Sequence, residues 1–217
     1  MASDLIWREV VHLRRAKPVV VYMSNQAASG GYYVSAPASA ILAQAATLTG
    51  SIGVWGGKFV TQGLFEKLRV GREVISRGKA AGLYSDTAPF SQDQRAKIQA
   101  DIGASYARFR SHVAKGRGME DDEVEAVARG RVWTGEQALE HGLVDALGDL
   151  QRAAEQAREL AGVPPNRHAP LVNLPAPKQP QLPLASAEAA GEWLAGLQAL
   201  LREGILALAP WSIRIRD

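Results

Sequence analysis

The sequence predicts an α/β fold in which parallel strands alternate with helices. Short β-branched apolar runs, such as VVVYM at 19–23, are separated by segments whose apolar residues recur at helical spacing. The chain has 217 residues, of which 47% are hydrophobic, so it can bury one sizeable core. We expect an α/β domain at 1–162, a proline-rich linker at 163–187 and an apolar C-terminal helix and tail at 188–217.

The first elements follow from capping residues and apolar periodicity. Ser3 or Asp4 can cap a helix, which Pro18 ends. The run at 19–23 is apolar on both faces, as expected of a strand buried in a parallel sheet. A helix is expected from about Gly31.

The middle of the chain continues the alternation. AILAQA at 40–45 and SIGVWG at 51–56 predict two more short strands. A helix is expected at 61–70, and the run REVISRG at 72–78 predicts another strand.

The second half of the domain is expected to be mainly helical. An amphipathic pattern predicts a long helix at 91–115, and a shorter helix follows the acidic run at 120–122. That run could hold a metal, but acids at a helix start complement its dipole, and we favour this interpretation. Thr134 is placed to cap a short helix, and a last helix is expected at 150–161.

Composition excludes several classes of function. The net charge of +3 is scattered along the chain, which argues against a nucleic-acid partner. There is no cysteine, and the four histidines lack metal-ligand spacing, so we expect neither a disulfide framework nor a metal. The glycine-rich segment at 50–57 lacks phosphate-binding spacing, and we expect no cofactor. Neither a signal peptide nor a membrane span is expected; the helix at 188–217 would dock on protein or lie on a membrane surface.

A serine lies at the turn of QAASGGYYVSAPA, between a predicted strand and a predicted helix. Ser29 would therefore lie at the carboxyl edge of the sheet, where reactive groups are favoured. The Gly30 N–H could donate to a developing oxyanion, and Gly31 leaves room for a substrate carbonyl. The motif is not G-x-S-x-G, because Ala27 stands two residues before the serine. From this stretch alone, a nucleophile and a simple helix cap are equally good interpretations.

A nucleophilic serine needs a base. No histidine has an acidic partner at a recognisable spacing, so a lysine whose pKa is lowered by burial is the other candidate. Lys79 follows the predicted strand at 72–78 and lies in a loop at its end.

Three segments resemble a known family. They are KPVVVYMSNQAASGGYYVSAPASAILAQAATLTGSIGV, KGRGM and ARGRVWTGEQALEHGLVDALGDL, and they are similar to the serine–lysine signal peptide peptidases, SppA. The resemblance covers about residues 2–161 and implies a crotonase- and Clp protease-like parallel sheet with flanking helices.

The resemblance also implies roles. Ser29 matches the nucleophile, Gly30 one oxyanion donor, and Ser51 the second serine that orients the base. The implied function is a serine endopeptidase that degrades residual signal peptides through an acyl-enzyme. The implied partners are peptide substrates, further copies of the chain and a membrane, and the implied location is the outer face of the bacterial inner membrane.

The chain departs from the family pattern in two places. In short members the base stands at the position of Ala81, two residues beyond Lys79, whereas this chain resembles the C-terminal repeat of long members, whose first repeat carries the lysine. The SPGGS turn that supplies the other oxyanion donor is expected before Ala2. The base is therefore Lys79 or a lysine of an N-terminal repeat. The alternatives to a peptidase are a catalytically incomplete scaffold or binding module, and a crotonase-type enzyme acting on coenzyme A thioesters.

Overall fold

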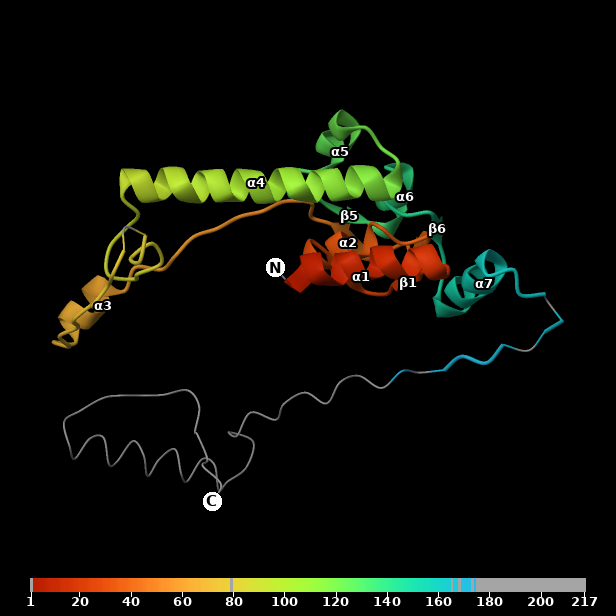
Figure 1. Cartoon of the computed structure of the whole chain (residues 1–217), viewed down its shortest axis with the longest axis horizontal. Coiled ribbons are helices and arrows are strands. Elements are labelled where there is room, and N and C mark those ends of the chain that lie inside the picture. Colours follow the sequence, from red (N-terminus) through yellow and green to blue (C-terminus); the bar gives the residue numbers. More distant parts are fainter. Residues whose placement is uncertain (1, 79, 165, 168, 173, 175–217) are drawn as a thin grey trace, which may run out of the picture. The chain divides into compact units, whose positions relative to one another are not determined.

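The computed structural model describes residues 2–174 except 79, 165, 168 and 173 (Figure 1). The chain divides into two units at 1–169 and 170–217. The predicted helix at 188–217 and most of the predicted linker lie outside the described residues. The predicted domain boundaries stay predictions.

One sheet contains the predicted buried strands. β1 (Val20–Met23), β3 (Ala40–Ala43) and β6 (Ala146–Leu147) pair in the order β1-β3-β6, and both pairs are parallel. Every residue of β3 is buried, which explains why its sequence is apolar without alternation. The predicted strands at 19–23 and 40–45 are thus confirmed, and so is the α/β class.

A second sheet consists of three-residue strands. β2 (Gln26–Ala28) pairs in parallel with β4 (Leu48–Gly50), and β4 pairs antiparallel with β5 (Val132–Thr134). The strand predicted at 51–56 is wrong. Gly50 and Ser51 have φ values of 73° and 49°, so the backbone leaves the extended conformation where that strand was expected to begin.

The strand predicted at 72–78 is also wrong. This segment pairs with no strand in the described part of the chain, and Ile75 is 92% exposed. Its β-branched residues therefore lack the packed neighbours on which a strand depends. The helix predicted at 61–70 is present but shorter, as α3 (Gln62–Lys67).

The remaining predicted helices within the described residues are confirmed. The first of them already begins at Ala2, so Ser3 and Asp4 lie inside it and neither is its N-cap. The capping hydroxyls of Ser91 and Thr134 each accept a hydrogen bond from the third residue of their helix. Within the described residues, no helix combines the length and the hydropathy that a membrane span requires. The helices are α1 (Ala2–Ala16), α2 (Gly30–Ser35), α4 (Gln92–Arg117), α5 (Asp121–Val127), α6 (Gly135–Glu140) and α7 (Leu150–Leu160).

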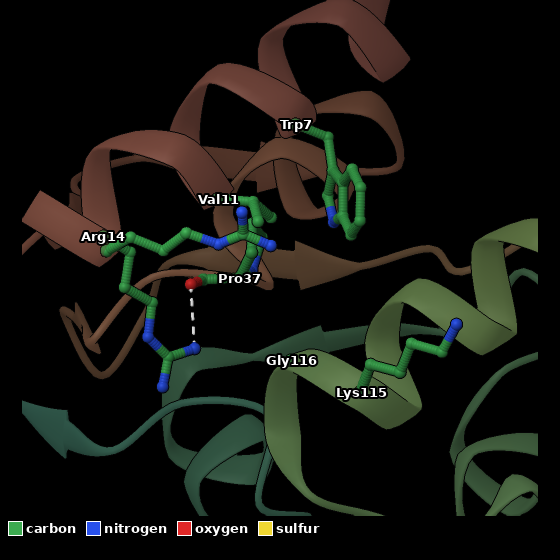
Figure 2. A pocket seen from close by; sticks show the side chains of 7 residues that line it. Trp7, Val11, Arg14, Pro37, Lys115 and Gly116 are labelled. Carbon is green, nitrogen blue, oxygen red and sulfur yellow. Dashed lines mark hydrogen bonds between the residues drawn. The ribbon is translucent and has the colours of Figure 1, made fainter.

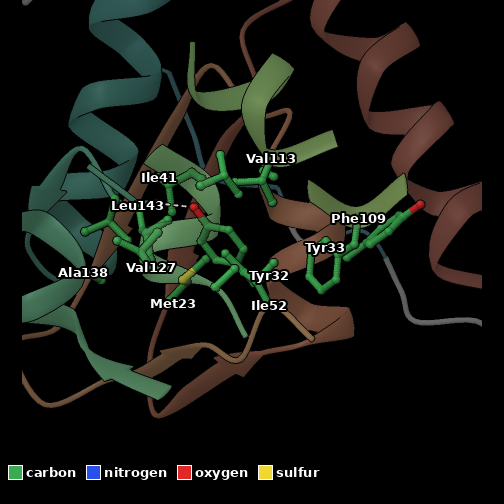
Figure 3. Packing of buried hydrophobic residues seen from close by; sticks show 14 of the residues in the cluster. Met23, Tyr32, Tyr33, Ile41, Ile52, Phe109, Val113, Val127, Ala138 and Leu143 are labelled. Carbon is green, nitrogen blue, oxygen red and sulfur yellow. Dashed lines mark hydrogen bonds between the residues drawn. The ribbon is translucent and has the colours of Figure 1, made fainter. Parts of the chain in front are cut away.

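The core is built around the two tyrosines of α2 (Figure 3). Tyr32 is fully buried, and its hydroxyl donates to the Leu143 carbonyl at 2.8 Å. Tyr33 packs on Phe109 of α4, and its hydroxyl donates to Asp4 of α1 at 3.0 Å. These contacts fix α2, and with it the turn that precedes α2, against α1 and α4.

A close approach of α4 to this core requires glycine at one position. A Cβ at Gly116 would lie 2.2 Å from the Ala36 carbonyl oxygen, whereas a Cβ at Gly103 of the same helix would meet nothing within 4 Å. We expect Gly116→Ala to lower the free energy of unfolding by about 1–3 kcal/mol through overpacking.

Gly103→Ala is the matched control, and we expect it to raise that free energy by about 0.5–1 kcal/mol through helix propensity. Urea unfolding of the two variants and the unmodified chain measures both changes. Equal stability of the two variants would contradict the close packing of Gly116.

Candidate active site

Ser29 occupies a strained turn between β2 and α2. Its φ and ψ are 53° and −112°, a conformation that costs a residue other than glycine about 1–3 kcal/mol. The turn is held by two backbone hydrogen bonds: the Ser29 N–H donates to Gly50 O at 2.9 Å, and the Tyr33 N–H donates to Ser29 O at 2.8 Å. Within the described chain the Ser29 hydroxyl makes no capping hydrogen bond, and the residue is exposed. The interpretation of Ser29 as a side-chain helix cap therefore does not hold.

Ser51 lies at the neighbouring strand end. β2 and β4 are in parallel register with Ala28 opposite Gly50, so Ser29 and Ser51 follow at adjacent positions of the same sheet edge. Adjacent strands lie about 4.8 Å apart. Ser51 also has a positive φ, and its N–H donates to Arg131 O at 2.7 Å.

Both serines line one pocket of about 700 Å³. One wall is the segment after β4, another is the middle of α4, and the third is the turn that follows α5. The lining residues are Ser29, Ser51, Gly53, Val54, Trp55, Gln99, Ile102, Gly103, Tyr106, Arg129 and Gly130.

The turn after α5 fits closely against the segment that follows Ser51. Arg129 and Gly130 have φ values of 59° and 74°, and the Gly130 N–H donates to Ile52 O at 2.9 Å. A Cβ at Gly53 would lie 2.8 Å from the Gly130 Cα, so glycine is needed there. Two left-handed turns therefore lie against each other beside the pocket.

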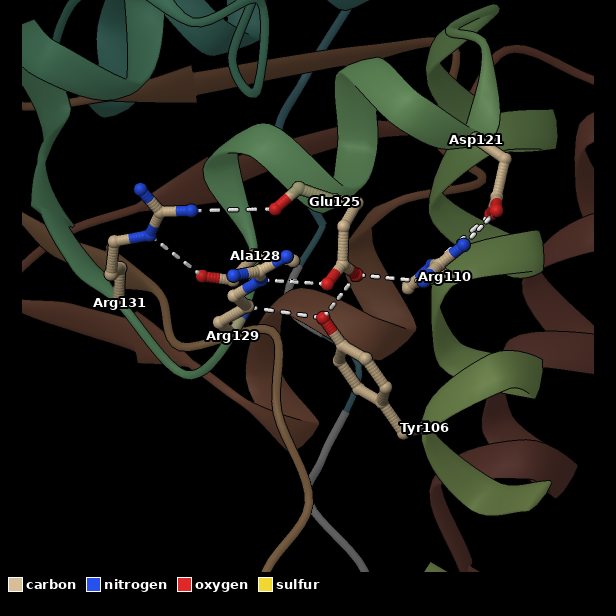
Figure 4. Close-up of polar contacts among 7 residues, drawn as sticks. All are labelled: Tyr106, Arg110, Asp121, Glu125, Ala128, Arg129 and Arg131. Carbon is tan, nitrogen blue, oxygen red and sulfur yellow. Dashed lines mark hydrogen bonds and ion pairs between the residues drawn. The ribbon is translucent and has the colours of Figure 1, made fainter. Parts of the chain in front are cut away.

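A polar network supports the same turn (Figure 4). Glu125 accepts hydrogen bonds from the Tyr106 hydroxyl at 2.6 Å, from Arg129 Nε at 2.7 Å and from Arg110 Nη1 at 2.7 Å. The Tyr106 hydroxyl and the Arg129 guanidinium stabilise the charged carboxylate, and the pKa of Glu125 falls to about 2. No sequence motif indicates this network, because its two halves, at 106–110 and 125–129, come from separate elements and each member is an ordinary polar residue of a helix or loop.

The other two predicted site residues are Gly30 and Lys79, and the structure describes only the first of them. Gly30 is the first residue of α2, directly after Ser29, and a Cβ on it would lie 3.3 Å from Ser3 Oγ. Lys79 lies outside the described residues, and of those that are described no lysine lines the pocket. The catalytic roles of Ser29, Gly30, Ser51 and Lys79 stay predictions.

A smaller pocket of about 400 Å³ lies between α1 and the end of α4 (Figure 2). Trp7 and Val11 form part of its wall, and Arg14 Nη1 donates to Pro37 O at 3.0 Å. Its cations Arg14, Arg15 and Lys115 lie in the last turns of α1 and α4, where positive charge is favoured by the helix dipoles. These cations therefore have a structural explanation, and neither predicted serine lines this pocket.

The fold and the larger pocket define an α/β protein with a serine at a strained strand-to-helix turn. Residues 12–164 match the sequence model of Peptidase family S49. The chain belongs to this family, which confirms the predicted resemblance to a family of serine peptidases.

Named relatives agree with this assignment. The chain is 44% identical over 178 residues to "Serine protease SPPA, chloroplastic" of Arabidopsis thaliana, covering 82% of this chain and 26% of that protein. It is 40% identical over 161 residues to "Protease 4" of Salmonella typhi, which covers 74% of this chain and 26% of that protein. It is 38% identical over 158 residues to "Putative signal peptide peptidase SppA" of Enterococcus faecium, which covers 72% of this chain and 46% of that protein.

The chain thus spans about a quarter of the length of the Arabidopsis and Salmonella proteins. Among solved structures, a mutant of the "1510-N membrane-bound stomatin-specific protease" matches with a TM-score of 0.42 and 16% identity, covering 71% of this chain and 61% of that one.

The pKa of Glu125 predicts a pH-dependent contribution to stability. Its folded value of about 2 is below the ordinary 4.5, so the stabilisation is present above about pH 4.5 and is lost as the pH falls toward 2. Urea unfolding of the unmodified chain and Glu125→Gln, from neutral pH down to about pH 3, measures it. We expect the unmodified chain to be the more stable at neutral pH and the difference to shrink in acid. A difference that stays constant with pH would contradict this.

Proposed function

We propose that this chain carries the nucleophile of a serine endopeptidase of the signal peptide peptidase type. One observation supports the proposal above the others: Ser29 and Ser51 stand in strained backbone at adjacent strand ends and line one pocket of about 700 Å³. Strained residues of this kind concentrate at functional sites. Membership of a peptidase family gives the reaction class.

The proposed reaction proceeds through an acyl-enzyme. Ser29 Oγ bonds to the substrate carbonyl carbon while its proton passes to a neutral lysine amine, and the carbonyl electron pair moves onto the oxygen. The Gly30 N–H can stabilise that oxyanion, because the first N–H groups of a helix have no acceptor within the helix. Collapse of the intermediate expels the peptide amine, which takes the proton from the lysine. Water then hydrolyses the ester.

Lys79 is our first candidate for the base, and Ser51 is proposed to orient it by a hydrogen bond. An amine can accept the serine proton only when it is uncharged, so its pKa must be lowered by burial or by neighbouring charge. A lysine from another segment or another chain is the alternative.

The pocket walls support an apolar substrate. Val54, Trp55 and Ile102 contribute aliphatic and aromatic surface beside the two serines. Such a pocket suits extended peptides with small or apolar side chains, as in the remnants of cleaved signal peptides. We accordingly propose these remnants as substrates and the outer face of the bacterial inner membrane as the place of action.

Three variants test the mechanism. We expect Ser29→Ala to abolish hydrolysis of alanine- and leucine-rich peptides and labelling by a fluorophosphonate, with unchanged circular dichroism. Ser51→Ala should lower kcat by about a hundredfold, as loss of one preorganised catalytic hydrogen bond does.

Lys79→Ala identifies the base. Loss of turnover in this variant, with the fold retained, supports Lys79, and unchanged turnover assigns the base to another lysine. Hydrolysis that persists in Ser29→Ala would overturn the proposed function.

We also propose that the chain associates with further copies through the segment at 54–75. Trp55, Phe59 and Ile75 are each 90–92% exposed, and Trp55 is also part of the pocket wall. We propose that they form one apolar surface, because contiguous exposed apolar patches mark interaction sites.

Sedimentation velocity tests this association. We expect the double variant Phe59→Asp/Ile75→Asp to sediment as a smaller species than the unmodified chain, because charge opposes burial of the surface. Leu160→Asp, at an exposed apolar position of α7, is the matched control and should leave the distribution unchanged. Identical distributions for all three proteins would reject the interface.

A further inference from the structure

We propose that Glu125 is a positioning residue for Ser51 and acts through Tyr106 and Arg129. Glu125 does not line the pocket and touches neither serine in the described structure. Its effect would therefore be indirect. The inference rests on the proposed function, because it assigns the network a task through the role of Ser51 in the reaction.

The first step is the contact between Ser51 and the turn after α5. The Ser51 N–H donates to Arg131 O at 2.7 Å, and the Gly130 N–H donates to Ile52 O at 2.9 Å. The first bond uses the backbone N–H of Ser51, and the second uses the backbone carbonyl of the next residue, so the turn binds the backbone on both sides of the Ser51 Cα. The orientation of Ser51 therefore depends on where the turn at 129–131 lies.

The second step is the conformation of that turn. Arg129 has a φ of 59°, which is disfavoured for a side chain with a Cβ, so external contacts must hold it. Two are present. The Arg129 backbone N–H donates to the Tyr106 hydroxyl oxygen at 3.2 Å, and Arg129 Nε donates to Glu125 at 2.7 Å.

The third step is the direction of the hydrogen bonds. Because Glu125 accepts the Tyr106 hydroxyl proton at 2.6 Å, the lone pairs of that hydroxyl remain for the Arg129 N–H. The Glu125 carboxylate thus acts on Arg129 in two ways: it binds the guanidinium directly, and it orients the hydroxyl that accepts the Arg129 N–H. Arg110 Nη1 in turn donates to the carboxylate at 2.7 Å. Figure 4 shows the chain of contacts from Arg110 to Arg129.

A second anchor lies on the far side of the turn. Arg131 Nε donates to Ala128 O at 3.0 Å, and Arg131 Nη2 donates to the Glu125 backbone carbonyl at 3.3 Å. These bonds do not use the Glu125 carboxylate, so they persist when only its charge is removed. A neutral substitution of Glu125 therefore tests positioning without dismantling the whole turn.

The test uses two variants and one control in the full chain. Glu125→Gln removes the acceptor charge, and Tyr106→Phe removes the hydroxyl while keeping the ring. Asp122→Asn removes an equal charge from an exposed position of the same helix, α5. Each is measured under conditions where it is folded, first by amide hydrogen exchange and then by peptide hydrolysis.

We expect faster exchange of the Ser51 and Gly130 amides in Glu125→Gln and Tyr106→Phe, by about tenfold, equivalent to ~1.4 kcal/mol. Turnover should follow: kcat falls by a similar factor in Glu125→Gln while KM stays within about twofold, since an interaction made only in the transition state is lost. Asp122→Asn should match the unmodified chain in both measurements.

The two measurements separate this inference from the proposed function. Exchange rates in Glu125→Gln equal to those of Asp122→Asn would overturn the positioning role, whatever the activity. Faster exchange with unchanged kcat would overturn the link to the reaction. Absence of Ser29-dependent turnover in the unmodified chain would reject the proposed function and, with it, the catalytic role of the network.

Discussion

The parallel pairing of β2 with β4 is the constraint on which the site depends. Its register places Ala28 opposite Gly50, and the residue that follows each strand is a serine in strained backbone. The antiparallel pairing of β4 with β5 then brings the turn at 129–131 to the same edge. Sequence positions about a hundred residues apart thus meet at one pocket because three short strands share one sheet.

The strain at this edge is supported by packing elsewhere. Ser29, Ser51 and Arg129 all have positive φ and all line the pocket. A residue keeps such a conformation only when contacts with the surrounding structure hold it there. The turn at Ser29 is followed directly by the buried tyrosines of α2, and the turn at Arg129 is held by Tyr106 and Glu125. The apolar core and the polar network therefore support different parts of the lining of one pocket.

The sequence predicted the elements whose stability is local or whose burial is complete. The helices capped by Ser91 and Thr134 and the strands at 19–23 and 40–45 were predicted correctly. Ser29 was singled out by its place between a strand and a helix, and Ser51 by the family resemblance. β2 and β5 were missed because three residues carry no periodicity. The run at 72–78 has strand-like composition without a partner, and the role of Glu125 depends on neighbours from α4 that no spacing reveals.

The exposure of the segment around position 79 has a consequence for the mechanism. Gly78, Ala80 and Ala81 are exposed. A lysine must be uncharged to accept the serine proton, which at neutral pH requires a lowered pKa. If Lys79 is the base, we propose that the association of copies buries its amine. The apolar side chains at 54–75 give a second copy of the chain a surface on which to do so. Association and activity are then coupled, because the same contact that buries Ile75 would also desolvate the base and lower its pKa.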